Sequence, residues 1–445
     1  MPNRSGGFLL LSHSHHLSIM AFRYQSLKGF RDTLPEESLR WQWLEGIIRD
    51  QMRRYGYGEL RLPLVESTEL FSRGVGEGTD VVSKEMYSFL DKSDPPESLT
   101  LRPELTAGAV RAWIEHEIGK NQGLTKWYYV GPAFRYEQPQ SGRYRQFTTF
   151  GIELIGSPLP EADAEVILAG VGLIESLGIR NYRLRLNSLG MPEERAAYRV
   201  ALLEFLNARR SQLSQESIRR MESNPLRVLD SKKEEDVAAT ADAPKILDFL
   251  ADESRAHFNR VRDLLDDAGV QYVVDHKLVR GLDYYTRTAF EFQGLDLGAQ
   301  DALGGGGRYD GLIEQLGGPA TPAIGFGFGM DRLLLAAEAA GAIPNQSAAL
   351  DVFVVGLGDS ARAWAVQTTR LIRQAGLAAD CDLLGRSMKA QMREANRRNA
   401  RHVVIAGDNE LAAGKAQLKD MQGHAQQEVE LGDLLNVIQS REEGG

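Results

Sequence analysis

The stretch KWYYVGPAFRYEQPQSGRYRQFTTFGIELI, residues 126–155, decides the fold. Its two ends, residues 126–136 and 146–155, are rich in the aromatic and β-branched residues that favour strands. Between them, Pro139, Ser141 and Gly142 have the composition of a turn. We therefore expect an antiparallel hairpin with a long polar tip, and with it an antiparallel sheet.

The chain before this hairpin predicts a helix and a strand. Residues 37–55 carry apolar side chains at helical spacing and are followed by Gly56 and Gly58, which are typical of a helix end. Residues 59–65 have the composition of a strand but contain Pro63, so such a strand is expected at an edge or an interface.

The chain after the hairpin changes character. Residues 191–265 are charged and rich in helix formers, which predicts a helical insertion. Strands return at 271–275 and 289–292, followed by the glycines of 304–307 and by the apolar segment 322–335.

The C-terminal part forms a unit of its own. Residues 341–349 have the composition of a linker. Beyond it, residues 350–445 alternate between strands and helices, which predicts a small α/β domain. Its expected elements are a strand at 352–356, helices at 361–375 and 386–401, and a strand at 402–406.

Composition limits the class of protein. A chain of 445 residues, 42% hydrophobic and 25% charged, is suited to two or three folded domains. The single cysteine, Cys381, excludes an internal disulfide and favours a reducing compartment, which we expect to be the cytoplasm. No apolar run is long enough to cross a bilayer, so no membrane is expected as a partner. Residues 1–19 are expected to be a loose extension, with Met20 as an alternative start.

Arginines suggest how a nucleotide is held. No G-x-x-x-x-G-K-[ST] phosphate loop occurs. Arginines and Mg²⁺ can hold a triphosphate instead, because guanidinium groups match phosphate oxygens. Any one of these arginines alone would be read as a surface or ion-pair residue, but several occur in short distinctive strings. They are Arg102, Arg135, Arg143, Arg145, Arg280 and Arg332.

These strings resemble the three motifs of class II aminoacyl-tRNA synthetases, in the correct order. Residues 62–66 (LPLVE) resemble motif 1, residues 134–137 (FRYE) with the strand that follows resemble motif 2, and residues 325–332 (GFGFGMDR) resemble motif 3. Two more strings, residues 278–285 (LVRGLDYY) and 305–311 (GGGRYDG), resemble segments peculiar to histidyl-tRNA synthetases. Residues 28–32 (KGFRD) also fit that family.

The resemblance implies a fold and an activity. It implies an α+β catalytic domain with an antiparallel sheet over residues 20–340, a helical insertion at about 191–265, and an α/β anticodon-binding domain over 350–445. It also implies a homodimer that uses ATP with Mg²⁺ to convert L-histidine to histidyl-adenylate. The histidyl group then passes to the 3′ end of tRNA(His), with release of AMP and pyrophosphate. No metal ligands are expected in the protein.

The resemblance also assigns residues. Arg135, Arg280 and Arg332 would be the catalytic arginines, and Arg143 would join them in binding ATP. Developing negative charge at the α-phosphate is best met by such fixed cations. The histidine site would comprise Glu104, Leu105, Thr106, Thr149, Glu153, Tyr284 and Tyr285. Without the flanking string, the two tyrosines would be read as core residues.

Two positions depart from the family. Many relatives have Gln where Thr149 stands, so its contact with the amino acid is expected to pass through water or to be lost. The family often has Arg at the position of Gln138, in the loop that would read the tRNA acceptor end together with Gln140. Glutamine keeps a hydrogen bond to a base edge but loses a phosphate-binding charge.

The helix expected at 386–401 is the candidate anticodon surface. A helical wheel places Met388, Met392 and Ala395 on one stripe and five cations on the opposite side, in a chain of net charge −9. A merely solvated charged face is the alternative. The cations are Arg386, Lys389, Arg393, Arg397 and Arg401, the first four of which we expect to bind tRNA.

Two other functions are compatible with parts of the sequence. The regulatory subunit of ATP phosphoribosyltransferase resembles this catalytic domain, but Arg280, the tyrosine pair and the anticodon-type domain speak against a non-catalytic role. The histidine-type strings speak against a synthetase for a different amino acid.

Overall fold

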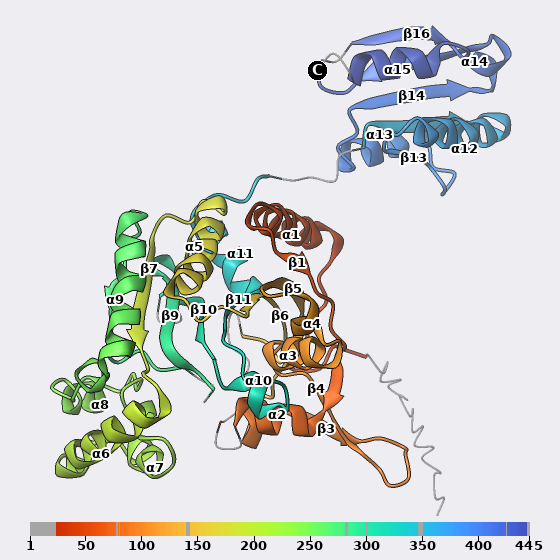
Figure 1. The fold of residues 1–445 in the computed structure, drawn as a ribbon. Helices are drawn as coiled ribbons and strands as arrows, with labels where there is room; N and C mark the ends of the chain where they lie inside the picture. The colour runs from red at the N-terminus through yellow and green to blue at the C-terminus, as the bar shows by residue number, and fades with distance from the viewer. Residues whose placement is uncertain are drawn as a thin grey trace, which may run out of the picture.

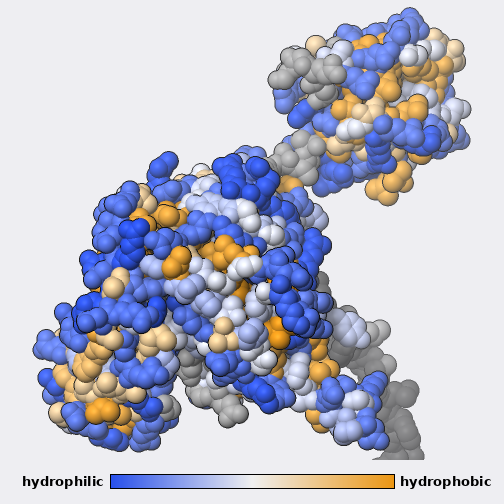
Figure 2. Space-filling view, in the orientation of Figure 1, coloured by the Kyte–Doolittle hydropathy of each residue, from blue (hydrophilic) through white to orange (hydrophobic). Residues whose placement is uncertain are grey.

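A computed structural model describes residues 24–76, 79, 81–138, 143–280, 284–298, 301–345, 350–423 and 425–442. Two bodies can be followed in Figure 1: a large one that contains the main sheet, and a smaller one formed by the C-terminal elements, in blue. The face seen in Figure 2 is mostly hydrophilic, with hydrophobic residues in patches on both bodies.

In the described part of the chain, eight strands form the main sheet, in the order β1-β5-β6-β11-β10-β9-β7-β8. Neighbours are antiparallel except at the two edges, where β1 pairs with β5 and β7 with β8 in parallel. The predicted antiparallel sheet is therefore confirmed. Its strands are β1 (Gly58–Glu59), β5 (Thr125–Phe134), β6 (Gln146–Ile155), β7 (Tyr182–Ser188), β8 (Val273–Val274), β9 (Thr286–Gly294), β10 (Ala302–Arg308) and β11 (Ala323–Gly329).

The hairpin at the centre of the prediction is present. β5 and β6 pair along their whole length, from Thr125 opposite Ile155 to Phe134 opposite Gln146. Residues 139–142 of its tip lie outside the described residues.

The single strand predicted at 59–65 is wrong. The structure has two short strands there, β1 and β2 (Val65–Ser67), which belong to different sheets. Pro63 cannot donate to a strand ladder, and the carbonyls of Leu62 and Pro63 accept from Nη1 of Arg102 at 2.8 and 3.0 Å. Both strands do lie at sheet edges, as the proline predicted.

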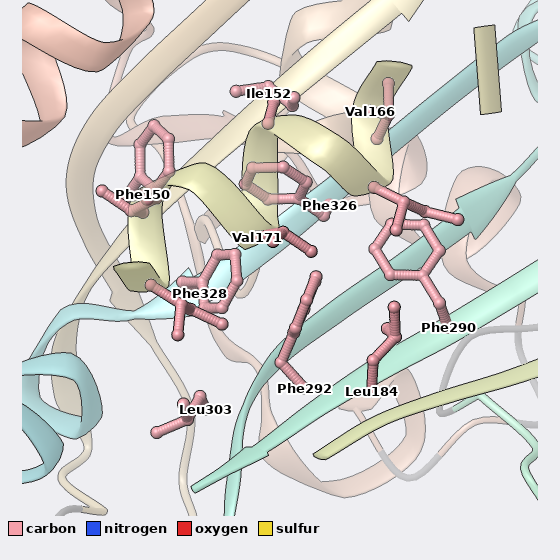
Figure 3. Packing of buried hydrophobic residues seen from close by; sticks show 14 of the residues in the cluster. Phe150, Ile152, Val166, Val171, Leu184, Phe290, Phe292, Leu303, Phe326 and Phe328 are labelled. Carbon is pink, nitrogen blue, oxygen red and sulfur yellow. The ribbon is translucent and has the colours of Figure 1, made fainter. Parts of the chain in front are cut away.

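One face of the main sheet is covered by helices and holds the largest core. Phe150, Phe290, Phe292, Phe326 and Phe328 project from the strands into this core (Figure 3). Most of their rings pack edge to face or tilted, and those of Phe150 and Phe328 are stacked. The helices that cover them are α1 (Pro35–Tyr55), α5 (Pro160–Ser176), α9 (Asp252–Asp267) and α11 (Met330–Ala339). Because strand side chains alternate between faces, glycines that alternate with these phenylalanines face the other side.

The other side of the sheet is only partly covered. Helices α3 and α10 pack at one end of it, beside a small sheet in the order β2-β4-β3. The remaining elements here are α2 (Thr68–Val75), β3 (Tyr87–Leu90), β4 (Ser98–Leu101), α3 (Thr106–Glu115), α4 (Ile118–Asn121) and α10 (Leu312–Gln315).

The predicted helical insertion has its own small core. Tyr198, Leu202 and Leu206 of α6 pack with Met221 and Val228. Helix α9, which the prediction included in the insertion, packs instead on the main sheet through residues such as Phe258. The helices are α6 (Pro192–Ala208), α7 (Gln215–Ser223) and α8 (Glu234–Ala239).

The C-terminal body is an α/β domain, as predicted. Its sheet has the order β13-β12-β14-β15-β16, parallel for the first three strands and antiparallel for the rest. Its elements are β12 (Val352–Leu357), α12 (Asp359–Gln374), β13 (Ala379–Cys381), α13 (Met388–Arg397), β14 (His402–Gly407), α14 (Asp408–Ala412), β15 (Lys415–Asp420), β16 (Gln426–Glu430) and α15 (Leu434–Glu442). Helix α13 is shorter than the predicted 386–401, because Asn399 takes a left-handed conformation.

Candidate active site

Glycines of β10 and β11, among them Gly305, Gly307 and Gly325, leave a flat surface without side chains on the open side of the main sheet, which we call the glycine floor. On this floor, an added methyl group at Gly325 would lie 2.0 Å from Oε2 of Glu153. Added methyl groups at Gly305 and Gly307 would lie 2.9 Å from Nη1 of Arg280 and 2.9 Å from the ring of Tyr285. Side chains of the candidate site therefore lie directly against the backbone, where only glycine fits.

All four arginines predicted to bind ATP line one cavity of about 300 Å³ over this floor. Arg135 and Arg143 come from the two sides of the hairpin loop, Arg280 from the loop before β9, and Arg332 from the start of α11. Burial lowers the pKa of Arg332, and the neighbouring charge of Arg143 lowers it further. Glu137, Glu291 and Asp331 line the same cavity, so four cations face three carboxylates, and the remaining excess of positive charge is suited to an anion.

Two of these arginines are held by defined contacts. Nε of Arg135 donates to the carbonyl of Pro103 at 2.8 Å, and its guanidinium lies 5.5 Å from the ring centre of Phe147. Nη1 of Arg280 lies 3.4 Å from Oε2 of Glu291, while its Nε is buried without a hydrogen-bond partner in the described structure.

A second, buried polar group lies on the same side of the sheet. The carboxylate of Glu153, on β6, accepts from the hydroxyl of Tyr129 at 2.8 Å and from the hydroxyl of Tyr309. Burial raises the pKa of Glu153 to about 7, although both hydroxyl groups oppose the shift. Tyr284 packs with its ring centre 5.6 Å from that of Tyr309 and 4.6 Å from that of Tyr285. This pocket offers one acid and several hydroxyl groups to a polar ring.

Three residues of the predicted histidine site, Glu104, Leu105 and Thr106, lie at the start of α3. The carboxylate of Glu104 accepts from the backbone N–H groups of Thr106 and Ala107 at 2.6 and 2.9 Å. Burial raises the pKa of Glu104. The hydroxyl of Thr106 lies 3.4 Å from that of Tyr129, which connects this corner to the Glu153 pocket. Leu105 packs its side chain into the core with Ala109 and Tyr129.

The side chain of Thr149 is hydrogen-bonded to the backbone of the neighbouring strand β11. Its hydroxyl donates to the carbonyl of Phe328 at 3.0 Å, and it pairs opposite Gly131 and Gly329 in the sheet. It therefore sits on the glycine floor, between the arginine cavity and the Glu153 pocket.

Comparison with known proteins agrees with this geometry. The family model described as histidyl-tRNA synthetase matches residues 29–333, and the model described as anticodon binding domain matches residues 351–441. The chain belongs to the histidyl-tRNA synthetase family.

Individual relatives agree along nearly the whole chain. A histidine–tRNA ligase of Desulforamulus reducens is 47% identical over 414 residues, which cover 93% of this chain and 98% of the relative. The solved structure of apo histidyl-tRNA synthetase from S. aureus superposes with a TM-score of 0.78 at 39% identity, covering 94% of this chain and all of that one. A Bacillus halodurans structure titled as an ATP phosphoribosyltransferase regulatory subunit/histidyl-tRNA synthetase has a TM-score of 0.63 at 23% identity, covering 87% and 99%, and shares the fold.

Several residues of this candidate site were not predicted. Tyr129 and Tyr309 hold Glu153, and Glu291 and Asp331 line the arginine cavity. Tyr309 lies within the string 305–311, so the sequence did contain a signal for it. Tyr129 could have been found from strand alternation, because it shares a face of β5 with Gly131.

Arg308, in the same string, serves the fold. Its side chain is completely buried on the opposite face of β10, where Nε donates to Oδ1 of Asp163 at 3.0 Å and Nη1 donates to the carbonyl of Ser157 at 2.9 Å. Asp163 also accepts from Nε2 of His257 at 2.8 Å if that nitrogen carries the proton, so the network joins β10 to α5 and α9.

The residues predicted to bind tRNA differ in exposure and in ion pairing. Gln138 is exposed beside the hairpin tip, and Gln140 lies outside the described residues, as do Gly281, Leu282 and Asp283. In the C-terminal domain, Arg386 pairs with Asp382 and Glu394, and Arg397 pairs with Glu394. Lys389 and Arg393 are exposed.

The buried stripe predicted for α13 is partly wrong. Ala395 is buried and Met392 is partly buried, but Met388 is 46% exposed. Gln391 is buried in its place, because its amide donates to the carbonyl of Arg386 at 2.7 Å and so ties the helix to the preceding loop.

Proposed function

We propose that this protein activates L-histidine with ATP to form histidyl-adenylate and then transfers histidine to the 3′ end of tRNA(His). The observation that carries the proposal is the convergence of four arginines and the Glu153 pocket on one glycine floor. Relatives that bear the name histidine–tRNA ligase over most of the chain support it.

The arginine cavity would hold ATP. When the histidine carboxylate attacks the α-phosphorus, pyrophosphate leaves and negative charge develops on the α-phosphate oxygens. Arg280, Arg135 and Arg332 are the fixed cations for that charge. Loss of one such group costs about 3–4 kcal/mol of transition-state stabilisation in other enzymes.

The Glu153 pocket would select histidine. A neutral imidazole has one N–H donor and one acceptor nitrogen, so it needs an acceptor and a donor from the protein. Glu153 supplies the acceptor, and the hydroxyl groups of Tyr284 and Tyr285 are candidates for the donor, because the hydroxyl of Tyr309 already donates to Glu153. A buried polar site of this kind rejects amino acids that lack these atoms much more strongly than an apolar slot does.

Glu104 and Thr106 would hold the α-amino group. The oxygens of Glu104 already accept from two backbone N–H groups, but each carboxylate oxygen has a further lone pair for an ammonium. Leu105 would contribute through its backbone, since its side chain lies in the core. Thr149 would reach the amino acid less directly than a glutamine, because its hydroxyl donates to Phe328.

Mg²⁺ enters the proposal as the companion of the ATP phosphates, whose charge it would share with the arginines. The described residues contain no group of three or more His, Cys, Asp or Glu side chains that could hold a metal ion, so we propose no protein ligands for it.

The remaining assignments belong to the assembled enzyme. We propose a cytoplasmic homodimer with its interface at the motif 1 segment, where Leu64 and Val65 are exposed in the single chain. Among the described residues, no helix is both long and apolar enough to span a bilayer. Residues 20–340 would carry out catalysis, with 341–349 as the linker. Residues 350–445 would read the anticodon through α13, while Gln138 and Gln140 would face the acceptor end.

The test of this function is tRNA charging. The protein is incubated with unfractionated tRNA, ATP, Mg²⁺ and each radiolabelled amino acid in turn, and label precipitated with tRNA is counted. We expect histidine alone to be attached. Absence of charging with every amino acid would favour the regulatory-subunit alternative.

A further inference from the structure

One carboxylate beside the ATP cavity is shared by two arginines. Oε2 of Glu291 faces Nη1 of Arg280 at 3.4 Å, whereas Oε1 accepts from Nη1 of Arg185 at 2.8 Å. The contact with Arg185 is short and that with Arg280 is long. Glu291 therefore interacts more strongly with Arg185 than with Arg280, the proposed catalytic arginine, although both lie within contact distance.

Arg185 is itself fixed from behind. It lies on β7 directly opposite Glu291 on β9, and its Nε and Nη2 both lie 2.8 Å from Oδ2 of Asp275. Asp275 follows β8, and its backbone N–H donates to the carbonyl of Leu186 at 2.9 Å. The order Asp275, Arg185, Glu291, Arg280 is thus a row of alternating charge that starts on the sheet and ends in the cavity.

This row has a consequence for Arg280. A carboxylate with no competitor would form the short, two-pronged pair that arginine favours, and would neutralise Arg280 and draw it toward β9. With Oε1 engaged by Arg185, Glu291 limits the orientation of Arg280 through one long contact. The guanidinium of Arg280 carries further N–H groups that are not engaged by Glu291, and these remain available to a ligand.

We infer that Arg185 is a positioning residue for adenylate formation, and that it acts by restraining Glu291 so that Arg280 remains available to the α-phosphate. The inference rests on the proposed function. Arg185 does not line the ATP cavity, whereas Arg280 and Glu291 do, so its effect would pass through Glu291.

The test is a double-mutant cycle on the full-length protein, with the rate of histidyl-adenylate formation measured by rapid quench. Arg185→Met should slow this step by about 10²-fold, the loss typical of a slight misplacement of a catalytic group. In a Glu291→Gln background, the same substitution should change the rate by no more than about twofold, because the competing charge is already gone.

Two controls separate positioning from folding. Arg183→Met changes an exposed arginine two residues away on the same face of β7, and should leave the rate unchanged. Asp275→Asn weakens the anchor of Arg185 and should give a smaller loss that Glu291→Gln also suppresses; it serves as the test if Arg185→Met does not fold.

An equal loss from Arg185→Met in both backgrounds, or no loss in the unmodified background, would overturn the inference. If the unmodified protein forms no histidyl-adenylate at all, the proposed function fails instead, so the two failures are distinguishable.

Discussion

Glu153 is a buried carboxyl group, and ionising it there costs free energy. Burial raises its pKa from 4.5 to about 7, so folding is favoured below pH 4.5, where the group is protonated in both states. That contribution is lost as the pH rises through 7, because the folded protein must then bury an anion. The same anion is the acceptor that the imidazole of histidine would need, so stability is given up for specificity at this position.

Glu153→Gln should therefore stabilise the free protein at pH 8, by up to about 3 kcal/mol for a shift of this size, and change it little near pH 4.5. Urea unfolding at the two pH values measures the difference. Glu193→Gln, at an exposed position, is the control and should show no such pH dependence. Equal effects of Glu153→Gln at both pH values would show that Glu153 is not buried as an anion.

Arg280→Ala should slow adenylate formation roughly 10²–10³-fold, because one fixed donor to the developing charge is lost. Rapid-quench measurement of histidyl-adenylate gives the rate, and circular dichroism checks the fold. Arg183→Ala, on exposed β7 surface, is the matched control. A near-normal rate for Arg280→Ala would mean that this arginine is structural.

At the residue scale, the sequence could indicate which residues matter but not which atoms they meet. Arg135, Arg280 and Arg332 lie in distinctive strings, and the structure does bring them to one cavity together with Arg143. The partners of Glu153 depend on strand register, since Tyr129 is two positions along β5 from the residue opposite Glu153, and Tyr309 comes from beyond β10. Register of this kind follows from tertiary packing.

At the scale of elements, the hairpin was predictable because both of its strands are long and its tip is rich in turn residues. The segment at 59–65 was not, because its course depends on Arg102, which lies 39 residues after Pro63 and binds its carbonyl. Helix α13 is a similar case. The helix ends before Asn399, whose backbone is left-handed. Glu394 lies among the arginines of the helix and forms ion pairs with Arg386 and Arg397, which reduces the positive charge of that face.

Helix α13 offers a test of anticodon binding. Because Arg386 and Arg397 share Glu394, we expect Lys389 and Arg393 to carry most of the contact with phosphate. Changing both to Ala should weaken tRNA binding and reduce the slope of log affinity against log salt by about 0.7 for each lost contact with single-stranded RNA. Filter binding across a salt series measures the slope, and Arg370→Ala on α12 is the control. An unchanged slope would assign the anticodon role to another surface of the domain.

At the scale of the whole molecule, the two bodies divide the proposed work. The cavity, the Glu153 pocket and the Arg185 row all lie on the main sheet, so we expect activation of the amino acid to need only the large body. Recognition of tRNA would use the C-terminal body as well. This division was predictable from the change in composition at 341–349, because linkers and domains differ in composition more clearly than neighbouring elements do.

We propose that the residues around the glycine floor join ATP to histidine and to no other amino acid. Amino-acid-dependent exchange of labelled pyrophosphate into ATP, carried out with each of the twenty amino acids and without tRNA, tests it most directly. We expect exchange with histidine alone, and only in the presence of Mg²⁺. Comparable exchange with another amino acid, or none with histidine, would contradict the account.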